Sequence, residues 1–230
     1  MDRPSVVVVL VGAGAGRRLG DEQPKAFRRI GGRPILAAAA SAAASVVGVR
    51  RLVAVVPPGA ETDARSALED VPVPVDIVPG GATRQDSVRA GLAVVEDAEG
   101  IVLVHDAARP FASIALFARV IEAIEGPVVA AVPVVPVTDT VVRVGDGALV
   151  GVESRDELAL AQTPQGFRIG VLRDAHAKAE GTGTSFTDDA TLVRWAGFEV
   201  RTVDGELGNR KITTSADLAD AEQRAGGTGA

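Results

Sequence analysis

The chain has 230 residues, of which 47% are hydrophobic and 3% aromatic, and its formal net charge is −6. This length and composition indicate a folded α/β protein, and the negative charge argues against a nucleic-acid partner. Because the chain has no cysteine, it can form neither disulfides nor thiolate metal sites. The apolar run at residues 6–11 is too short to span a membrane, so we expect a cytoplasmic protein without a membrane partner.

A buried strand and a glycine-rich loop open the chain. Residues 6–11 form a β-branched run that is typical of a strand buried on both faces. Residues 12–16 are Gly-Ala-Gly-Ala-Gly, whose small side chains let backbone N–H groups approach an anion closely. The cations Arg17, Arg18 and Lys25 follow. This combination predicts a polyphosphate-binding loop, and the alternative is a structural turn with solvated arginines.

Two familiar phosphate loops do not match this stretch. A Walker A loop needs Gly-Lys-Ser/Thr where Arg17-Arg18 stands, and a dinucleotide fingerprint from Gly12 needs glycine at position 17. The predicted second strand, residues 51–56, ends in Pro57-Pro58 and lacks the acidic residue that holds a ribose in dinucleotide folds. A nicotinamide oxidoreductase is therefore disfavoured. The remaining pattern is similar to nucleotidyltransferases that activate sugars and polyols.

The first half of the chain alternates strands and helices, as parallel α/β folds do. We predict helices over residues 35–46 and 60–69 and a strand over residues 73–78. A second glycine loop follows at residues 79–82, and Thr83 is placed to cap a helix that runs to about residue 96. This loop either approaches a ligand closely or simply joins a strand to a helix.

A polar stretch follows the next predicted strand, residues 101–104, where a parallel sheet binds its ligands. Asp106 stands there, and a carboxylate facing a polyphosphate is a natural Mg²⁺ ligand. The alternative is a surface salt bridge between Asp106 and Arg109. Since adjacent side chains of an extended segment point in opposite directions, we expect His105 to pack or hydrogen-bond beneath the site.

The second half of the chain contains a predicted arm. Residues 141–144 and 148–152 are β-type runs around Gly145-Asp146-Gly147, which predicts a hairpin. The hairpin interrupts the alternation of strands and helices, so we expect an arm over about residues 134–158 that projects from the sheet. An isolated two-stranded arm is marginally stable, and a second subunit is its expected packing partner.

The other predicted elements of this half are conventional. We expect four helices: over residues 113–125, over residues 168–180, from a cap at Asp188-Asp189 to Trp195, and from a cap at Ser215 onwards. We also expect strands over residues 128–132 and 198–203 and a loop that leads into a strand at residues 208–213. The first of these helices should turn an apolar stripe towards the core, made of Ile114, Phe117, Ile121 and Ile124. His176 lies in a polar helix and should be exposed.

Five stretches can be read together: G-A-G-A-G-R-R with Lys25, G-G-A-T-R-Q-D-S-V at 80–88, H-D-A-A-R-P at 105–110, T-P-Q-G-F at 163–167 and N-R-K-I-T at 209–213. In this order, over nearly the whole chain, they resemble the 2-C-methyl-D-erythritol 4-phosphate cytidylyltransferases of the non-mevalonate isoprenoid pathway. The resemblance implies a single Rossmann-like nucleotidyltransferase domain over residues 1–230, with a mostly parallel twisted sheet, flanking helices and a protruding β-hairpin arm. It also implies transfer of CMP from CTP to methylerythritol phosphate, with Mg²⁺ and release of pyrophosphate.

The resemblance implies roles for individual residues. Arg18 and Lys25 match the pair that stabilises charge on the α-phosphate, and Asp106 matches a carboxylate on the metal side of the site, beside the CTP phosphates. The nucleotide-binding positions are matched by Ala13, Gly14, Ala15, Gly16, Gly80, Gly81, Ser87, Asp106 and Ala107. The positions that grip the polyol phosphate are matched by Arg109, Thr140, Arg155, Thr163, Thr187 and Lys211. In the family, Thr140 and Arg155, with Arg109 as a further candidate, reach the neighbouring subunit's site, so a homodimer belongs to this hypothesis.

The chemistry and the alternatives follow from the same residues. The acceptor phosphate is ionised at neutral pH, so the reaction needs cations, Mg²⁺ and positioning but no general base. Ribitol-5-phosphate cytidylyltransferase, a GTP- or UTP-dependent sugar-phosphate enzyme and a non-catalytic nucleotide-binding module remain open. A non-catalytic module would lack one of the cations or the carboxylate of the site, whereas this chain has Arg18, Lys25, Asp106 and Lys211. The residues alone do not separate the two polyol phosphates.

Overall fold

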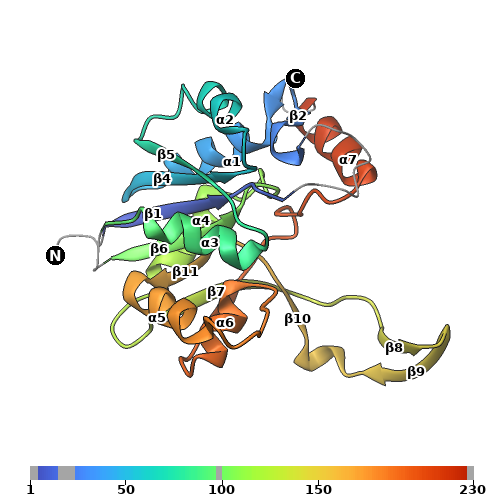
Figure 1. Cartoon of the computed structure of the whole chain (residues 1–230). Coiled ribbons are helices and arrows are strands. Elements are labelled where there is room, and N and C mark those ends of the chain that lie inside the picture. Colours follow the sequence, from blue (N-terminus) through green and yellow to red (C-terminus); the bar gives the residue numbers. More distant parts are fainter. Residues whose placement is uncertain (1–4, 15–23, 97–99, 227–230) are drawn as a thin grey trace.

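A computed structural model describes residues 5–14, 24–96 and 100–226 (Figure 1). Its centre is an eight-stranded sheet in the order β10-β7-β11-β6-β1-β4-β5, with β12 paired to β7. The middle strand β1 (Val6–Val11) runs parallel to both β4 (Val49–Val56) and β6 (Ile101–Asp106). These strands confirm the predicted parallel core.

The two ends of the sheet differ. Beyond β4, β5 (Val75–Pro79) continues the parallel pairing. Beyond β6 the sheet becomes mixed, because β11 (Gln165–Arg168) lies antiparallel between β6 and β7 (Ala130–Pro136). The strand β10 (Ala159–Ala161) is antiparallel to β7, and β12 (Arg201–Asp204) is parallel to it. The sheet is therefore mostly parallel, and the antiparallel strands β10 and β11 are short segments that show no clear periodic pattern in the sequence.

Helices cover both faces of the sheet (Figure 1). One face packs against α1 (Ile35–Ala44), α2 (Glu61–Ala67) and α4 (Ile114–Glu122). The other face packs against α3 (Arg84–Ala93), α5 (Ile169–Ala179) and α6 (Asp189–Trp195). Alternate residues of β1 enter the two cores, which explains why nearly every position of this strand is apolar.

Short elements complete the described chain: η2 (Lys25–Phe27), β2 (Arg29–Ile30), β3 (Arg33–Pro34), η3 (Arg155–Glu157) and the last helix α7 (Ser215–Gly226). The helix α7 and the β2–β3 pair enclose a small separate core around Ile30, Ile35 and Ile212. Among the described residues, no helix is long and apolar enough to cross a membrane.

Several local predictions were wrong. Of the predicted α4 stripe, Phe117 and Ile124 are buried and Ile121 packs against the core, but Ile114 is 49% exposed, and Leu116 and Val120 are buried beside Phe117 instead. His176 is 5% exposed rather than solvated, since α6 packs against α5. The cap of α7 is Thr214 rather than Ser215, because Thr214 Oγ1 accepts from Asp217 N. In addition, β12 begins later than expected, and residues 208–213 form a loop without a strand.

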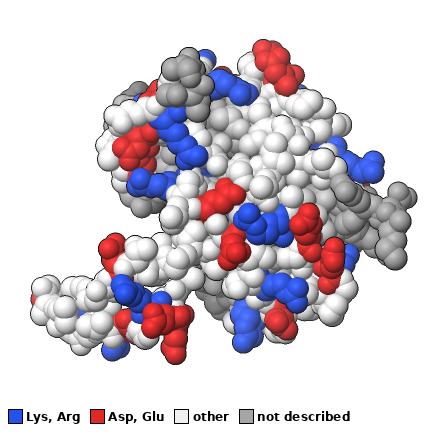
Figure 2. Space-filling view, turned by 180° about the vertical axis from the view of Figure 1, so that it is seen from behind, with Lys and Arg blue, Asp and Glu red and all other residues white. Residues whose placement is uncertain are grey.

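The arm leaves the body of the molecule as predicted (Figure 1). It consists of β8 (Val141–Gly145) and β9 (Ala148–Glu153), which pair antiparallel. Asp146 (φ 50°) and Gly147 (φ 78°) form the left-handed turn that two-residue hairpins prefer. Val144, Leu149, Val150 and Val152 are each more than 60% exposed, and the outer part of the arm is mostly uncharged (Figure 2). The arm therefore presents apolar surface that the described part of its own chain leaves uncovered.

Candidate active site

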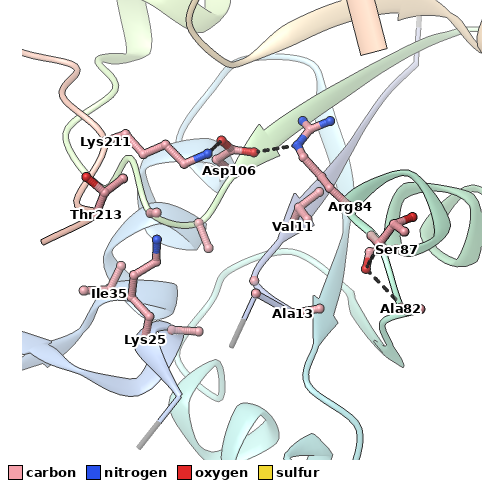
Figure 3. Close-up of a pocket in the computed structure, with 17 residues that line it drawn as sticks. Val11, Ala13, Lys25, Ile35, Ala82, Arg84, Ser87, Asp106, Lys211 and Thr213 are labelled. Atoms are coloured by element: carbon pink, nitrogen blue, oxygen red, sulfur yellow. Dashed lines mark hydrogen bonds and ion pairs between the residues drawn. The ribbon is translucent and has the colours of Figure 1, made fainter. Parts of the chain in front are cut away.

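A cavity of about 470 Å³ opens at the carboxyl ends of the central strands (Figure 3). The segment after β1, the segment after β6, the first turn of α3 and the loop before α7 surround it. Its lining comprises Val11, Gly12, Ala13, Gly14, Lys25, Ala26, Ile35, Gly81, Ala82, Thr83, Arg84, Ser87, Asp106, Ala107, Ala108, Lys211 and Thr213. This is the edge where a parallel sheet binds its ligands.

The two glycine loops meet at this cavity. A Cβ atom added to Gly80 would overlap the Cβ of Ala13, so only glycine lets the second loop lie against the first. The second loop is fixed by Ser87, which is 3% exposed. Its Oγ accepts from Gly81 N (3.2 Å) and donates to Thr83 O (2.9 Å). Thr83 caps α3 as predicted, in a reciprocal capping box with Asp86.

Asp106 lies between two cations (Figure 3). Lys211 Nζ is 2.6 Å from Asp106 Oδ2, and Arg84 Nε is 3.2 Å from Oδ1. Burial by itself would raise the pKa of Asp106, but the charges of Arg84 and Lys211 outweigh it and hold that pKa well below its usual range. The carboxylate is therefore ionised throughout the physiological pH range. The alternative pairing with Arg109 is wrong: Arg109 Nη1 donates to Asn209 O (2.7 Å).

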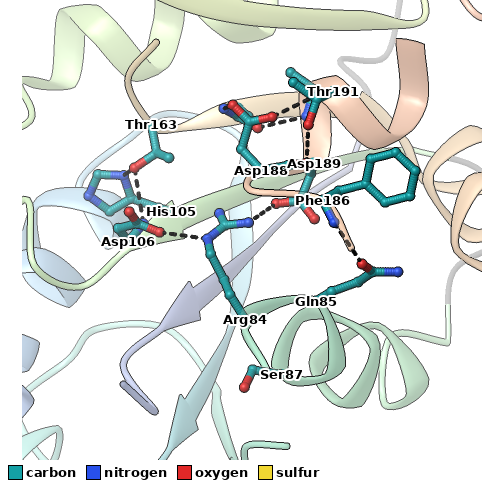
Figure 4. Close-up of polar contacts among 12 residues, drawn as sticks. Arg84, Gln85, Ser87, His105, Asp106, Thr163, Phe186, Asp188, Asp189 and Thr191 are labelled. Carbon is teal, nitrogen blue, oxygen red and sulfur yellow. Dashed lines mark hydrogen bonds and ion pairs between the residues drawn. The ribbon is translucent and has the colours of Figure 1, made fainter. Parts of the chain in front are cut away.

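A directed chain of hydrogen bonds supports Asp106 from beneath (Figure 4). Asp106 N donates to Thr163 Oγ1 (3.0 Å), which lies 3.1 Å from His105 Nδ1, and His105 Nε2 lies 3.1 Å from Arg109 O. A carbonyl oxygen can only accept, so Nε2 carries the proton, and Nδ1 accepts from the Thr163 hydroxyl. Burial lowers the pKa of His105 to about 4, so its imidazole is neutral near pH 7. His105 is a support under the site, as predicted, and its ring nitrogens are engaged.

This buried imidazole makes stability depend on pH. In the unfolded chain His105 takes up a proton near its ordinary pKa of 6.5, whereas in the folded protein it stays neutral down to about pH 4. Acidification through this window favours the unfolded chain, so the stabilisation present above pH 6.5 is lost towards pH 4. We expect His105→Asn to remove about 2 kcal/mol of the stability difference between about pH 7 and pH 5 in urea unfolding. An equal pH dependence in both proteins would contradict this assignment.

Among the described residues, the cationic side chains in the lining are Lys25, Arg84 and Lys211, and Lys25 stands on the side of the first loop. Its Nζ donates to Ile212 O (2.9 Å), next to Lys211 in the chain. Asp106 is the one carboxylate among the described lining residues, so positive charges outnumber negative charges there. An excess of positive charge in a hollow attracts polyphosphates. Ala15, Gly16 and Arg18 of the predicted site lie outside the described residues.

The structure brings together part of the predicted set. The predicted residues in the lining are Ala13, Gly14, Lys25, Gly81, Ser87, Asp106, Ala107 and Lys211. Six others lie outside it: Gly80, Arg109, Thr140, Arg155, Thr163 and Thr187. Gly80 adjoins Ala13, and Thr163 is 4% exposed beneath Asp106. Thr140 and Arg155 flank the arm, where Arg155 Nη1 donates to Thr138 O (2.7 Å). Thr187 lies just before α6.

Two polar side chains of the lining were assigned no role from the sequence, Arg84 and Thr213. Arg84 is the charged residue of the stretch G-G-A-T-R and opens α3, so its position after a glycine loop was the available signal. Thr213 stands two residues after Lys211, on the same loop. The spacing around each residue is equally typical of an ordinary helix start or loop, so the sequence does not identify either one as a ligand contact.

Asp106 is the acidic group that a metal ion could use at this cavity. Among the described residues, no group of three or more acidic or histidine side chains is arranged to hold a metal by itself. Mg²⁺ is commonly bound by one or two carboxylates together with substrate phosphates and water. An ionised carboxylate beside a hollow rich in cations fits that donor set, provided that phosphates supply the remaining oxygens.

Comparisons with known proteins match nearly the whole chain to one family. The family model described as IspD, 2-C-methyl-D-erythritol 4-phosphate cytidylyltransferase, matches residues 6–225. The chain is 45% identical over 214 residues to the Rhodococcus jostii protein of that description, across 93% of this chain and 92% of the relative. It is 43% identical over 226 residues to the bifunctional enzyme IspD/IspF of Chelativorans, across 96% of this chain and 55% of the relative. The chain thus spans about half the length of the bifunctional relatives that it matches.

Solved structures extend the likeness to the fold. The 2-C-methyl-D-erythritol 4-phosphate cytidylyltransferase of Thermus thermophilus superposes with a TM-score of 0.79 at 39% identity, over 97% of this chain and 99% of that one. The 4-diphosphocytidyl-2C-methyl-D-erythritol synthase of Anaerococcus prevotii superposes with a TM-score of 0.85 at 27% identity, over the same shares. The fold of this chain as a whole is therefore one that such enzymes adopt.

Proposed function

The chain belongs to the IspD family of 2-C-methyl-D-erythritol 4-phosphate cytidylyltransferases, and we propose that it transfers CMP from CTP to 2-C-methyl-D-erythritol 4-phosphate. The products are 4-diphosphocytidyl-2-C-methyl-D-erythritol and pyrophosphate. The observation that carries this proposal is the cavity in which two closely packed glycine loops face Lys25, Arg84 and Lys211 around one ionised carboxylate. We place this reaction in the cytoplasm, where nucleoside triphosphates are available.

The reaction joins two anions. An oxygen of the acceptor phosphate forms a bond to the α-phosphorus of CTP, and the bond from that phosphorus to the bridging oxygen of pyrophosphate breaks. The backbone around Ala13 and Gly14 takes the triphosphate, while Lys25 and Arg18 stabilise the charge on the α-phosphate. No base is required, which agrees with a neutral His105 whose ring nitrogens are engaged.

Asp106 is the residue that we propose for Mg²⁺. When bound, the ion would neutralise negative charge on the CTP phosphates, as Mg²⁺ does in phosphoryl and nucleotidyl transfer. Arg84 and Lys211 keep the Asp106 carboxylate ionised and fix both of its oxygens. The described chain thus supplies one oriented carboxylate, and Lys211 beside it can also meet a phosphate of either substrate.

The remaining contacts follow the matched positions of the family. Gly81 of the second glycine loop and Ser87 of α3 line the cavity side by side, and we propose that the cytosine base lies there. The acceptor contacts are assigned to Arg109, Thr140, Arg155, Thr163, Thr187 and Lys211. In this structure Thr163 Oγ1 accepts from Asp106 N, and Arg109 Nη1 donates to Asn209 O. These two side chains therefore also support the site from beneath.

Pyrophosphate release from purified protein with CTP and Mg²⁺ tests this function. We expect fast release with 2-C-methyl-D-erythritol 4-phosphate and little with ribitol 5-phosphate. Faster release with ribitol 5-phosphate would overturn the choice of acceptor. Binding of CTP without release on either acceptor would overturn the proposed reaction and favour a different acceptor or a non-catalytic nucleotide-binding module.

We also propose that two copies associate through their arms. Exposed apolar side chains gather on β8 and β9, with Val144 67% and Leu149 65% exposed. A second copy would bury this surface, and it would bring Thr140 and Arg155 towards the neighbouring cavity, which they do not line in their own chain. The dimer is therefore part of the proposed site.

Charging the arm tests the dimer. We expect the double variant Val144→Asp, Leu149→Asp to elute as a monomer at concentrations where the parent protein is a dimer, because a carboxylate buried in an apolar interface is strongly disfavoured. The measurement is the mass in solution by size exclusion with light scattering. A monomeric parent protein, or a variant that still dimerises, would contradict the proposal.

A further inference from the structure

Arg84 joins two carboxylates that belong to different parts of the molecule (Figure 4). Its Nε is 3.2 Å from Asp106 Oδ1 at the end of β6, and its Nη1 is 2.6 Å from Asp189 Oδ2 at the start of α6. The third nitrogen, Nη2, is buried and has no hydrogen-bond partner among the described residues. Two guanidinium nitrogens are thus engaged by carboxylates of different elements, so Arg84 links the end of β6 to the start of α6.

Asp189 depends on this contact. Its side chain is 2% exposed, and a buried carboxylate requires compensating charge. Arg84 supplies a charged hydrogen bond at one oxygen, and His176 Nε2 lies 3.6 Å from the other. Burial by itself would lower the pKa of Arg84, but Asp189 and Asp106 raise it above its ordinary value. The position of the first turn of α6 is therefore coupled to a residue of α3.

The neighbouring residue of α3 makes a second connection (Figure 4). Gln85 Oε1 accepts from Phe186 N (3.4 Å), and the Phe186 ring packs on Trp195 at a centroid distance of 5.2 Å. Residues 186–189 are thus held at both ends by consecutive residues of α3, and Thr187 lies between these anchors in the chain. The helix α3 itself starts directly after the second glycine loop, at the Thr83 cap.

We infer that Arg84 is a positioning residue that, through Asp189, fixes the segment carrying Thr187 relative to the second glycine loop. The inference rests on the proposed function in one respect, namely that the segment carrying Thr187 contacts the acceptor phosphate. It predicts that the ion pair of the partly buried Arg84 with Asp189, beside the contact of Gln85 with Phe186, keeps the nucleotide side and the acceptor side of the cavity in their relative position. Loss of this link should displace the acceptor side while the glycine loop keeps its own capping box and its Ser87 contacts.

Amide hydrogen exchange without any substrate tests the link directly. We expect Arg84→Gln and Asp189→Asn each to accelerate exchange about tenfold or more in the peptide covering residues 184–195, whose protected amides include Ala190 N and Thr191 N. The double variant should add little to either single one, because both remove the same contact. The matched control is Arg89→Gln, an exposed arginine on the same helix, which should leave this peptide unchanged.

Steady-state kinetics separates positioning from general destabilisation. Asp189→Asn keeps the pair of Arg84 with Asp106, so we expect the KM for the acceptor to rise about tenfold while the KM for CTP changes less than about threefold. Arg84→Lys keeps a charge and should fold where Arg84→Gln does not, with part of the acceptor affinity restored. Parent-like exchange in both single variants, or equal rises in the two KM values, would overturn the inference. Absence of turnover in the parent protein would instead refute the proposed function and leave the exchange test intact.

Discussion

Replacing Lys25 with alanine is expected to lower turnover by about 100-fold or more, the usual loss when one donor to the transition state is removed. Lys25 lines the cavity from the side of the first glycine loop and holds Ile212 O at 2.9 Å, so its ammonium group is oriented before substrate arrives. The reaction brings two anions together, and an alanine there leaves their repulsion uncompensated. Arg18→Ala should have a loss of similar size, on the sequence pattern alone.

Lysine is scarce in this chain, which supplies a matched control. Lys178→Ala makes the same chemical change on the surface of α5, where Nζ donates to Ala196 O and lies over the Trp195 ring, away from the cavity. Turnover of Lys178→Ala should equal that of the parent protein. Circular dichroism and thermal unfolding of Lys25→Ala should also match the parent protein. Parent-like turnover in a folded Lys25→Ala protein would remove Lys25 from the catalytic set.

Replacing Asp106 with asparagine should reduce both stability and activity. The substitution leaves Arg84 and Lys211 without the carboxylate that each contacts, at a site where Asp106 is only 7% exposed. Removing one partner of a buried charged set costs about 3 kcal/mol or more in the free energy of unfolding. Turnover should fall about 100-fold or more, because the proposed Mg²⁺ ligand is lost and the two cations lose their fixed orientation.

The control for Asp106→Asn is a partly exposed pair. Asp76→Asn breaks the ion pair of Asp76 with Arg51, whose side chains are about one-third exposed, and should change stability by less than about 1 kcal/mol. Urea unfolding at neutral pH measures both variants. Saturating Mg²⁺ should not restore the activity of Asp106→Asn. A variant at Asp106 with parent-like stability or turnover would show that the carboxylate is not the centre of this site.

The sequence was most informative where a local pattern is sufficient. The β-branched run at 6–11 predicted a strand buried on both faces, and its alternate residues do enter two cores. Thr83 as a helix cap and Gly145-Asp146-Gly147 as a hairpin turn were confirmed, because both depend on the conformations of a few adjacent residues. The position of Asp106 followed from a general property of parallel sheets, namely that ligands bind at the carboxyl ends of their strands.

Only the tertiary structure decided which polar groups meet. The partners of Asp106 lie 22 and 105 residues away in the sequence, and those of Arg84 include Asp189 at a separation of 105. The burial of His176 and the inward face of α4 depend in the same way on how two elements pack. Local periodicity and spacing determine the elements and the end of the sheet where a ligand binds. Contacts between distant side chains depend on the register of one element against another, which one sequence does not encode in any local pattern.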